Sequence, residues 1–519
     1  MTSASALSRR RRLAVLGICS FSLFMNYIDS TALNVALPTL ARELHAGVAS
    51  LQWVVDAYML VLASLLLAAG SAADRLGRRR VFSIGLLTFS AGSLLCSLAP
   101  NVASLIAFRA LQALGGCMLT PVSLSIVRNV FTDPAERARA MGVWSAVFGL
   151  ATACGPIVGG LIVSGFGWRA IFWVNVPVGL TAFVLTRLFV PESRSPRPRP
   201  LDLSGQLLVI VLLASLTGAI IEGPVRGWSS PLIAGAFACA AVAAVALVAV
   251  ELRRAEPLLE VRFFRSRPFA GATAVGVASF TVLSGFLFVN TLDLQLARGD
   301  SALAAGVALL PATAAIPVAA VISGRVLARR GPTGVMAAGG ALLVAAMGVL
   351  ARLGPAPGRG TLAGAYVLLG LGMGLVSPPV TNIGVNAMPP SQAGVASAVT
   401  SVSRQLGNLF GVAAFGALFA SSLRSGLPAG LASAGLTPAG RAARLSGAGV
   451  GLAGAHAAVA GALRDAITGA THAPYVFGAA CGAACVLLAV SLTGRRAHAA
   501  ASRRQRDPAL SGAAGPPGP

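Results

Sequence analysis

Lysine is absent from this chain, and charge of either sign is scarce. All 40 basic residues are arginines, 16 residues are acidic, and only 11% of the 519 residues are charged, against about a quarter in ordinary soluble proteins. Without lysine there is no P-loop lysine to contact nucleotide phosphates and no side-chain amine for Schiff-base catalysis. ATP binding by a P-loop is therefore excluded, and the protein must draw energy from another source.

Histidine and cysteine are also few and scattered. The four histidines are His45, His456, His472 and His498, and the seven cysteines form no CxxC pair. Neither pattern is typical of a metal site, and cysteines in apolar segments behave as small buried hydrophobes. No HExxH motif and no GxSxG motif in a suitable context is present. We therefore expect no cofactor, no bound metal and no enzymatic activity.

Hydrophobic residues are abundant instead. They make up 56% of the chain, and the mean hydropathy is +0.79, an excess that a soluble fold of this size could not bury. A membrane helix needs about 20 apolar residues. Suitable segments are 13–37, 50–72, 81–98, 104–126, 141–163, 170–190, 205–221, 231–250, 268–292, 303–327, 334–352, 361–380, 395–420 and 474–494. The sequence predicts an all-α polytopic membrane protein with 14 transmembrane helices.

The arginine distribution predicts the orientation. With the N-terminus inside, 28 of the 40 arginines fall in cytoplasmic segments, as the positive-inside rule requires. An even number of helices then places both termini in the cytoplasm. The basic charge is thus a topology signal in a lipid bilayer, and nucleic-acid binding is not expected.

The helices divide into six, two and six. Residues 1–190 are expected to form an N-terminal six-helix bundle, and 191–267 to supply basic linkers and two extra helices. Residues 268–494 would form a C-terminal six-helix bundle with a long outer loop at 421–473, followed by a disordered tail at 495–519. Two six-helix halves are the architecture of a large class of transporters, whose substrate site lies near the membrane midplane between the halves.

Three ionisable residues lie inside predicted spans of the first half. Asp29, Asp56 and Arg109 fall about 8 to 12 Å from the outer ends of their helices at 1.5 Å per residue. Intramembrane charge is costly and marks functional sites. Desolvation favours the neutral carboxyl and a nearby guanidinium favours the carboxylate, so either Asp could load and release a proton, and Asp29 is the first choice. The alternative is a static ion pair that locks the half together.

Two further segments contain candidate functional residues, several of which are glycine or proline. The segment between the second and third spans reads Gly70-Ser-Ala-Ala-Asp-Arg-Leu-Gly-Arg-Arg-Arg80, in which Asp74, Arg75, Gly77 and Arg78 are candidate functional residues. In the fifth span, proline removes a backbone donor and small residues allow close helix packing, which together suit a pivot between the halves. The residues concerned are Gly149, Gly155, Pro156, Gly159 and Gly160.

These motifs resemble those of the major facilitator superfamily, and specifically its fourteen-helix drug:proton antiporters. The resemblance is carried by Asp29-Ser-Thr-Ala-Leu-Asn-Val-Ala-Leu-Pro38, Trp53-Val-Val-Asp-Ala-Tyr58, Arg109-Ala-Leu-Gln112, the fifth-span motif, Trp168-Arg-x-Ile-Phe-x-x-Asn175-x-Pro177-x-Gly179, and Ser403-Arg404-Gln405-x-Gly407. It covers nearly the whole chain. It implies the major-facilitator fold, a bacterial cytoplasmic membrane location, and proton coupling through Arg109.

One position departs from the family pattern. Asp293 precedes Leu-Gln near the outer end of the ninth span, where members of the family usually have an aromatic residue. We favour a solvated carboxylate at the membrane edge, and an extra cation-attracting group is the alternative. Spans 10 to 14 contain no acids, which argues against selectivity for dications.

The sequence therefore predicts a proton-coupled antiporter that exports hydrophobic or amphipathic drugs or antibiotics by alternating access. Its partners would be protons, small apolar substrates and lipid. The alternatives are a dedicated exporter of one endogenous metabolite and, with less support, a proton-driven importer. A monomer is expected.

Overall fold

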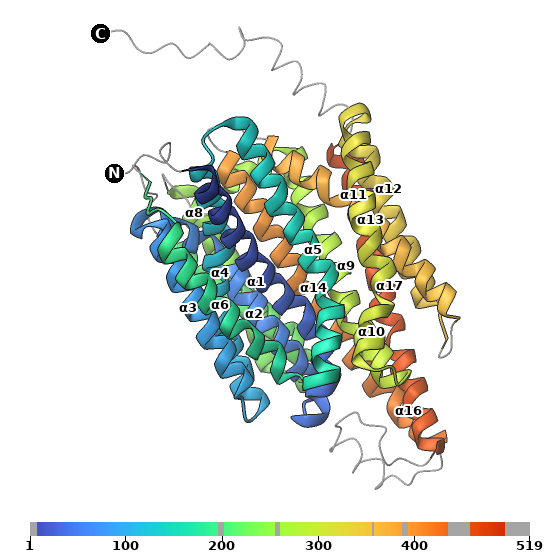
Figure 1. Ribbon diagram of the computed structural model, residues 1–519. Helices are drawn as coiled ribbons and strands as arrows, with labels where there is room; N and C mark the ends of the chain where they lie inside the picture. The colour runs from blue at the N-terminus through green and yellow to red at the C-terminus, as the bar shows by residue number, and fades with distance from the viewer. Residues whose placement is uncertain are drawn as a thin grey trace.

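The computed structural model of the chain is a bundle of long helices that run roughly side by side (Figure 1). The structure describes residues 8–195, 202–254, 260–354, 358–386, 393–433 and 457–493, and all regular elements in these ranges are helical. Helices are the expected solution, because every peptide group in hydrocarbon must find its hydrogen-bond partner within the protein. The predicted tail at 495–519 and residues 434–456 of the predicted outer loop lie outside the described ranges.

The first half of the molecule contains six long helices. They are α1 (Arg9–Glu43), α2 (Val48–Leu76), α3 (Arg78–Ser97), α4 (Val102–Val130), α5 (Pro134–Phe166) and α6 (Arg169–Phe189). Four of them contain the whole predicted apolar segment, and α3 and α6 end one residue before the predicted ends at 98 and 190. Capping residues help to fix the ends: Asn101, for example, accepts from the Ser104 amide and closes a capping box at the start of α4.

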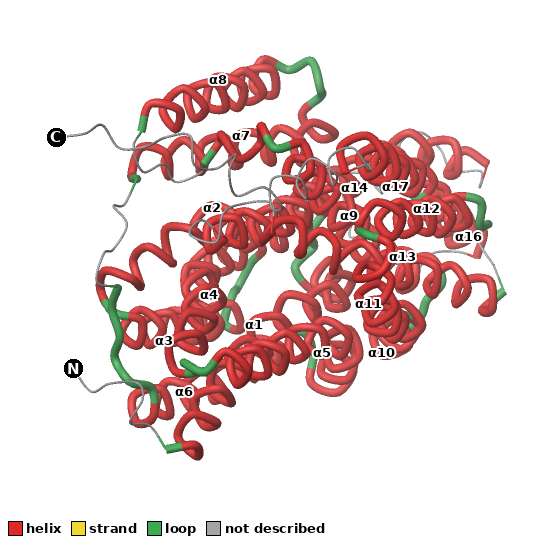
Figure 2. The backbone as a smooth tube through the Cα atoms, turned by 90° about the horizontal axis from the view of Figure 1, so that it is seen from above, coloured by secondary structure: helices red, strands yellow, loops and turns green. Residues whose placement is uncertain are grey.

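Two additional helices, α7 (Leu203–Arg226) and α8 (Pro231–Arg253), follow the first half. Seen from above, α8 lies at the edge of the molecule and α7 lies between it and the main bundle (Figure 2). Helix α7 packs against α2 of the first half and α14 of the second half. The short helix η2 (Val261–Arg265) then leads into the second half.

The second half begins with α9 (Arg267–Leu292), which continues into one π-helical turn, η3 (Asp293–Ala297). The next helices are α10 (Ala302–Ala308), α11 (Leu310–Arg330), α12 (Pro332–Ala351), α13 (Arg359–Asn386), α14 (Ala393–Ser433), α16 (Ala457–Ala470) and α17 (His472–Thr493). The span predicted at 303–327 is therefore two helices, α10 and α11, which meet at Leu309. The expected outer loop at 421–473 is helical at both of its ends.

Thirteen of the described helical segments are long and apolar enough to cross a membrane, and α5 makes fourteen if its two bent parts count as one span. This agrees with the fourteen predicted spans, and the chain is a multi-pass membrane protein. Helix α1 begins and α17 ends at the same end of the bundle (Figure 1), as an even number of crossings requires.

The two halves contact each other through a few helix pairs. Helix α14 packs against α2, α5 packs against α10 and α11, and α1 contacts α9. Gln295 of η3 donates to the Val35 carbonyl of α1 at 2.9 Å, which ties the halves together toward the C-terminal ends of α1 and α9.

Candidate functional site

A fully buried ion pair lies in the core of the first half. Arg109 of α4 donates from Nη1 to Oδ2 of Asp29 in α1 at 2.6 Å, and both side chains have no exposed surface. Each residue sits well inside its helix, so neither charge can reach water at a helix end. Two of the three ionisable residues predicted to lie at similar depth are therefore in direct contact.

Two amides complete the surroundings of the Asp29 carboxylate. Gln112 of α4 donates to Oδ1 at 2.9 Å, and Asn175 of α6 donates to the same oxygen at 2.7 Å. Asn175 is itself placed by Ser93 of α3, whose hydroxyl lies 3.1 Å from the amide nitrogen. A buried ion pair is tolerable only when further hydrogen bonds replace lost water, and these amides supply them. One carboxylate thus joins α1, α4 and α6.

Arg109 is held from the other side by aromatic rings and carbonyls. Its guanidinium carbon lies 4.2 Å from the centre of the Tyr58 ring, a cation–π geometry, and Nε donates to the Val54 carbonyl at 3.3 Å. The Tyr58 hydroxyl donates to Asn26 of α1. Gly116 leaves room for that pair, because a Cβ there would lie 2.6 Å from the Tyr58 hydroxyl.

Asp56 of α2 is not part of this cluster. Its side chain is completely buried, and neither carboxylate oxygen has a hydrogen-bond partner among the described residues. One helical turn earlier, Gln52 donates to the Val412 and Ala413 carbonyls of α14 at 3.2 and 2.9 Å. Positions four residues apart share a helix face, so Asp56 lies on the α2 face that packs against the second half.

The segment between α2 and α3 forms a compact structure where the two helices meet. Asp74 accepts two bonds from Arg78, at 2.9 and 3.2 Å, and Gly77 turns the chain with φ of +110°, a backbone conformation that favours glycine. The Ser195 amide donates to the Asp74 carbonyl and the Arg78 amide to the Ser193 carbonyl. The segment therefore fastens the chain that leaves α6. Gly70 faces Pro121 of α4, and Arg75 is exposed.

The small residues of α5 lie where two other elements approach closely. A Cβ on Gly159 would lie 2.7 Å from the Ala32 Cα of α1, and one on Gly160 would lie 2.7 Å from the Ala302 carbonyl oxygen of α10. Gly155 faces Thr31 of α1, whereas Gly149 has open space around it. Near Pro156 the helix bends by 44°, between Thr152 and Cys154, as proline does within a helix. Helix α5 thus contacts both halves.

The predicted motif of the thirteenth span lies in α14. Arg404 donates to Ser401 at 3.2 Å and interacts electrostatically with Tyr27 of α1, across the two halves. Gln405 accepts from Asn408 at 3.1 Å, and a Cβ on Gly407 would lie 2.7 Å from the Cβ of Phe280 in α9. Arg404 is therefore the member of this motif that faces the first half.

Asp293 is not a solvated edge carboxylate, and the interpretation that we favoured from sequence was wrong. Its side chain is buried and forms an ion pair of 2.7 Å with Arg298 Nε. The reason is tertiary: α16, which was expected to be part of a loop, covers the C-terminal end of α9 and supplies Thr468 as a further partner at 3.3 Å.

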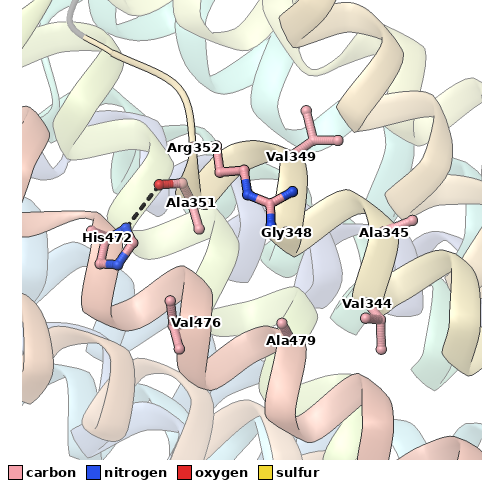
Figure 3. Close-up of a pocket in the computed structure, with 9 residues that line it drawn as sticks. All are labelled: Val344, Ala345, Gly348, Val349, Ala351, Arg352, His472, Val476 and Ala479. Atoms are coloured by element: carbon pink, nitrogen blue, oxygen red, sulfur yellow. Dashed lines mark hydrogen bonds between the residues drawn. The ribbon is translucent and has the colours of Figure 1, made fainter.

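A groove of about 550 Å³ lies between α12 and α17 (Figure 3). Its walls are mostly apolar, with Arg352 and His472 at one end, where His472 Nδ1 lies 2.8 Å from the Ala351 carbonyl. Both helices belong to the second half, so this groove is separate from the interface between the halves. No group of three or more His, Cys, Asp or Glu side chains is suited to metal binding within the described ranges.

Sequence analysis did not assign a role to Gln112 or Asn175. Both were visible only as parts of motifs, Arg109-Ala-Leu-Gln112 and Asn175-x-Pro177. The spacing of Gln112, three residues after Arg109 on one helix, could have indicated a shared face. Nothing local in the sequence places Asn175 on Asp29, because α6 lies far away along the chain.

Comparisons with known proteins agree with this architecture. A sequence model described as Major Facilitator Superfamily matches residues 19–412. The chain is 36% identical to multidrug resistance protein Stp of Mycobacterium tuberculosis (strain CDC 1551 / Oshkosh) over 418 residues, which covers 80% of this chain and 78% of that protein. It is 36% identical to the tetracenomycin C resistance and export protein of Streptomyces glaucescens over 429 residues, covering 82% and 79%. With multidrug efflux pump LfrA of Mycolicibacterium smegmatis the identity is 35%, covering 83% and 86%.

Solved structures with a similar fold are also transporters. A bacterial homolog of the human lysosomal transporter Spinster, in an inward-facing and occupied conformation, has a TM-score of 0.65 at 18% identity, covering 93% of this chain and 97% of that one. An auto-inhibited POT family peptide transporter has the same TM-score at 17% identity, covering 93% and 97%. At these identities the likeness shows the fold alone.

Proposed function

Because the chain belongs to the Major Facilitator Superfamily, we propose that it exports hydrophobic or amphipathic small molecules in exchange for protons, by alternating access. The relatives named for multidrug resistance, efflux and antibiotic export support this substrate class. The location is a bacterial cytoplasmic membrane with both termini inside, which the arginine distribution supports. The proposed division is an N-terminal bundle at 1–190, two inserted helices, and a C-terminal bundle from 268.

The observation that carries the proposal is the Asp29 carboxylate, buried between three helices and bonded to Arg109, Gln112 and Asn175. Arginine does not lose its proton in proteins, so Asp29 is the group of this pair that can bind and release one. Protonation removes the negative charge that the guanidinium and both amides contact. The arrangement of α1, α4 and α6 thereby becomes sensitive to a single proton.

This sensitivity couples the proton to movement of the halves. Helix α1 carries Asp29 and also contacts the second half, where Val35 accepts from Gln295. Ala32 of α1 packs against Gly159 of α5, and α5 in turn packs against α10 and α11 of the second half. A change in the α1 position at Asp29 therefore reaches the outer contact between the halves. One proton that crosses 100 mV supplies about 2.3 kcal/mol, a useful amount for moving a small molecule.

Asp56 is the second proton-coupling residue. It has no cation or donor within hydrogen-bonding reach among the described residues, and a buried carboxylate without a partner is costly. We therefore assign it the protonated form in this conformation. Since it lies on the α2 face that packs against α14, separation of α2 from α14 would expose it to water and allow the proton to leave.

The substrate occupies the interface between the halves, near Tyr27 and Arg404. These residues approach each other from α1 and α14. The surrounding spans are predominantly apolar, and apolar contacts are non-directional, so several unrelated lipophilic compounds are accommodated. Arg404 supplies a fixed positive charge at this interface.

The test uses inverted membrane vesicles that contain the protein and are acidified inside. Ethidium, tetraphenylphosphonium and a set of lipophilic antibiotics are added in turn, and internal pH is followed with a fluorescent dye. We expect several unrelated compounds to collapse the pH gradient. Asp29→Asn should abolish the response in vesicles that contain the same amount of folded protein as the wild-type vesicles.

Asp465→Asn is the matched control, because Asp465 is an exposed acid of α16 and its loss should leave exchange intact. Normal coupled export by Asp29→Asn would contradict the proposal. A response to one compound only would indicate a dedicated exporter. Uptake driven by a proton gradient of the opposite sense would indicate an importer.

A further inference from the structure

A second buried carboxylate lies at the outer end of the second half. Asp293 is the first residue of η3, and its side chain is 6% exposed. Its Oδ2 accepts from Arg298 Nε at 2.7 Å, and its Oδ1 accepts from Thr468 of α16 at 3.3 Å. An aspartate at the end of a membrane helix could easily face water, so its enclosure by α16 requires an explanation.

The surroundings of Asp293 are polar and ionisable. Arg298 and Asp300 follow it along the chain, Tyr366 approaches from α13, and Tyr475 approaches from α17. The Tyr366 hydroxyl donates to Oδ1 of Asn290 at 2.6 Å. The Asn290 amide nitrogen is buried and has no hydrogen-bond partner among the described residues.

A small cavity adjoins the carboxylate. Its volume is about 10 Å³, and its walls include Asn290, Asp293, Arg298, Thr468 and Tyr475. A polar cavity of this size is close to the volume that one water molecule needs. It lies at the outer end of the second half, between the carboxylate and α16. A water molecule in this cavity would lie next to the Asp293 carboxylate.

The arrangement resembles the Asp29 site in composition. The first helix of each half carries Asn-x-x-Asp, namely Asn26-Tyr-Ile-Asp29 in α1 and Asn290-Thr-Leu-Asp293 in α9. In both cases a tyrosine hydroxyl donates to the asparagine and an arginine pairs with the aspartate. The tyrosine comes from α2 in one half and from α13 in the other.

The same turn of helix also forms a contact between the halves. Two residues after Asp293, Gln295 donates to the Val35 carbonyl of α1. The Arg298 amide donates to the Asp293 carbonyl at 3.1 Å, which closes the π-helical turn. Asp293 therefore holds, through Arg298, the short segment that keeps the outer side of the molecule joined.

We propose that Asp293 is a further proton-binding site, in addition to Asp29 and Asp56, loaded from the outer side and coupled to the outer contact between the halves. The inference rests on the proposed proton exchange. A hydronium ion gives its proton to an Asp293 oxygen and leaves water behind. Arg298 keeps its proton, so the charge of the cluster rises by one. The Asp293–Arg298 bond weakens, and the turn that carries Gln295 is freed from α1.

Infrared spectroscopy tests this without transport. Full-length protein in lipid nanodiscs is titrated from alkaline to acidic pH, and the carbonyl stretch of protonated carboxyl groups is followed. We expect Asp293→Asn to remove one titrating component and Asp465→Asn to leave that component unchanged. Arg298→Gln should retain the Asp293 component to more alkaline pH, since the stabilising cation is lost.

If Asp293→Asn folds poorly, Asp293→Glu and Thr468→Val still test whether the titrating component belongs to Asp293. The glutamate should restore a titrating component, and the valine should extend the protonated form to more alkaline pH because a donor to the carboxylate is removed. The inference is overturned if folded Asp293→Asn and Thr468→Val titrate like the wild type. The titration tests the Asp293 site even if vesicles do not exchange ethidium for protons. Failure of this inference is therefore distinguishable from failure of the proposed function.

Discussion

Replacing Arg109 with methionine removes the cation from a site in which Asp29 is completely buried. Breaking a buried ion pair by removal of one partner costs about 3–5 kcal/mol. Asp29 keeps the amide donors Gln112 and Asn175, so we expect the lower end of that range, about 3 kcal/mol. Asp29→Asn should cost a similar amount, since it leaves the guanidinium buried without a counter-charge.

The double variant Asp29→Asn with Arg109→Met carries no buried charge at this site. Its loss of stability should therefore be smaller than the sum of the two single losses by about 2 kcal/mol or more, within the range for residues in contact. Unfolding is measured on purified protein in detergent micelles titrated with SDS, with far-UV circular dichroism and tryptophan fluorescence as probes.

The exposed Glu43–Arg169 pair provides a second double-mutant cycle as the matched control. Both side chains are nearly half exposed, at 46% and 44%, and the ion pair is 3.0 Å long, so its coupling should stay below about 1 kcal/mol. The reasoning is refuted if the two single losses of stability at Asp29 and Arg109 add up to the loss in the double variant within about 0.5 kcal/mol. That result would mean that the two charges do not stabilise each other.

Three further outcomes follow from the geometry, each measured by the same SDS titration. Gly159→Ala should lower the free energy of unfolding by roughly 1–3 kcal/mol through overpacking, whereas Gly149→Ala, with open space around it, should be neutral or stabilising by up to about 1 kcal/mol. Gly77→Ala should destabilise by about 1–2 kcal/mol, because its φ of +110° is strained for alanine. Asp74→Asn should cost less than about 1 kcal/mol, since the ion pair with Arg78 is partly exposed; a larger loss would mean that Asp74 supports the cytoplasmic end through its side chain.

The sequence was most informative where a pattern has a direct physical cause. A membrane helix needs a long apolar run because its peptide groups must bond to each other in hydrocarbon, and the predicted spans coincide with the observed helices. Helix ends were less predictable. Helix α14 continues to Ser433, well past the apolar segment at 395–420, because polar residues outside the bilayer can also be helical.

Depth in the membrane follows from the sequence more directly than rotation about a helix axis does. Asp29, Asp56 and Arg109 were expected to lie at similar depth, and depth follows from helix rise alone. Rotation about each helix axis does not follow from depth, and it is rotation that directs Asp29 toward Arg109 and Asp56 onto the face that meets α14. Asp293 was misplaced for a related reason, since its burial depends on α16.

The sequence by itself determined the class of protein, the number of membrane helices, and the presence of Asp29, Asp56 and Arg109 inside membrane spans, because hydropathy and charge are local properties of the chain. The tertiary structure alone decided which charges meet. Asp29 is joined to Arg109, Gln112 and Asn175 across three helices, Asp56 has no such partner within the described ranges, and Asp293 is covered by a distant segment. These pairings depend on how helices pack and rotate against one another, and packing is a property of the whole bundle.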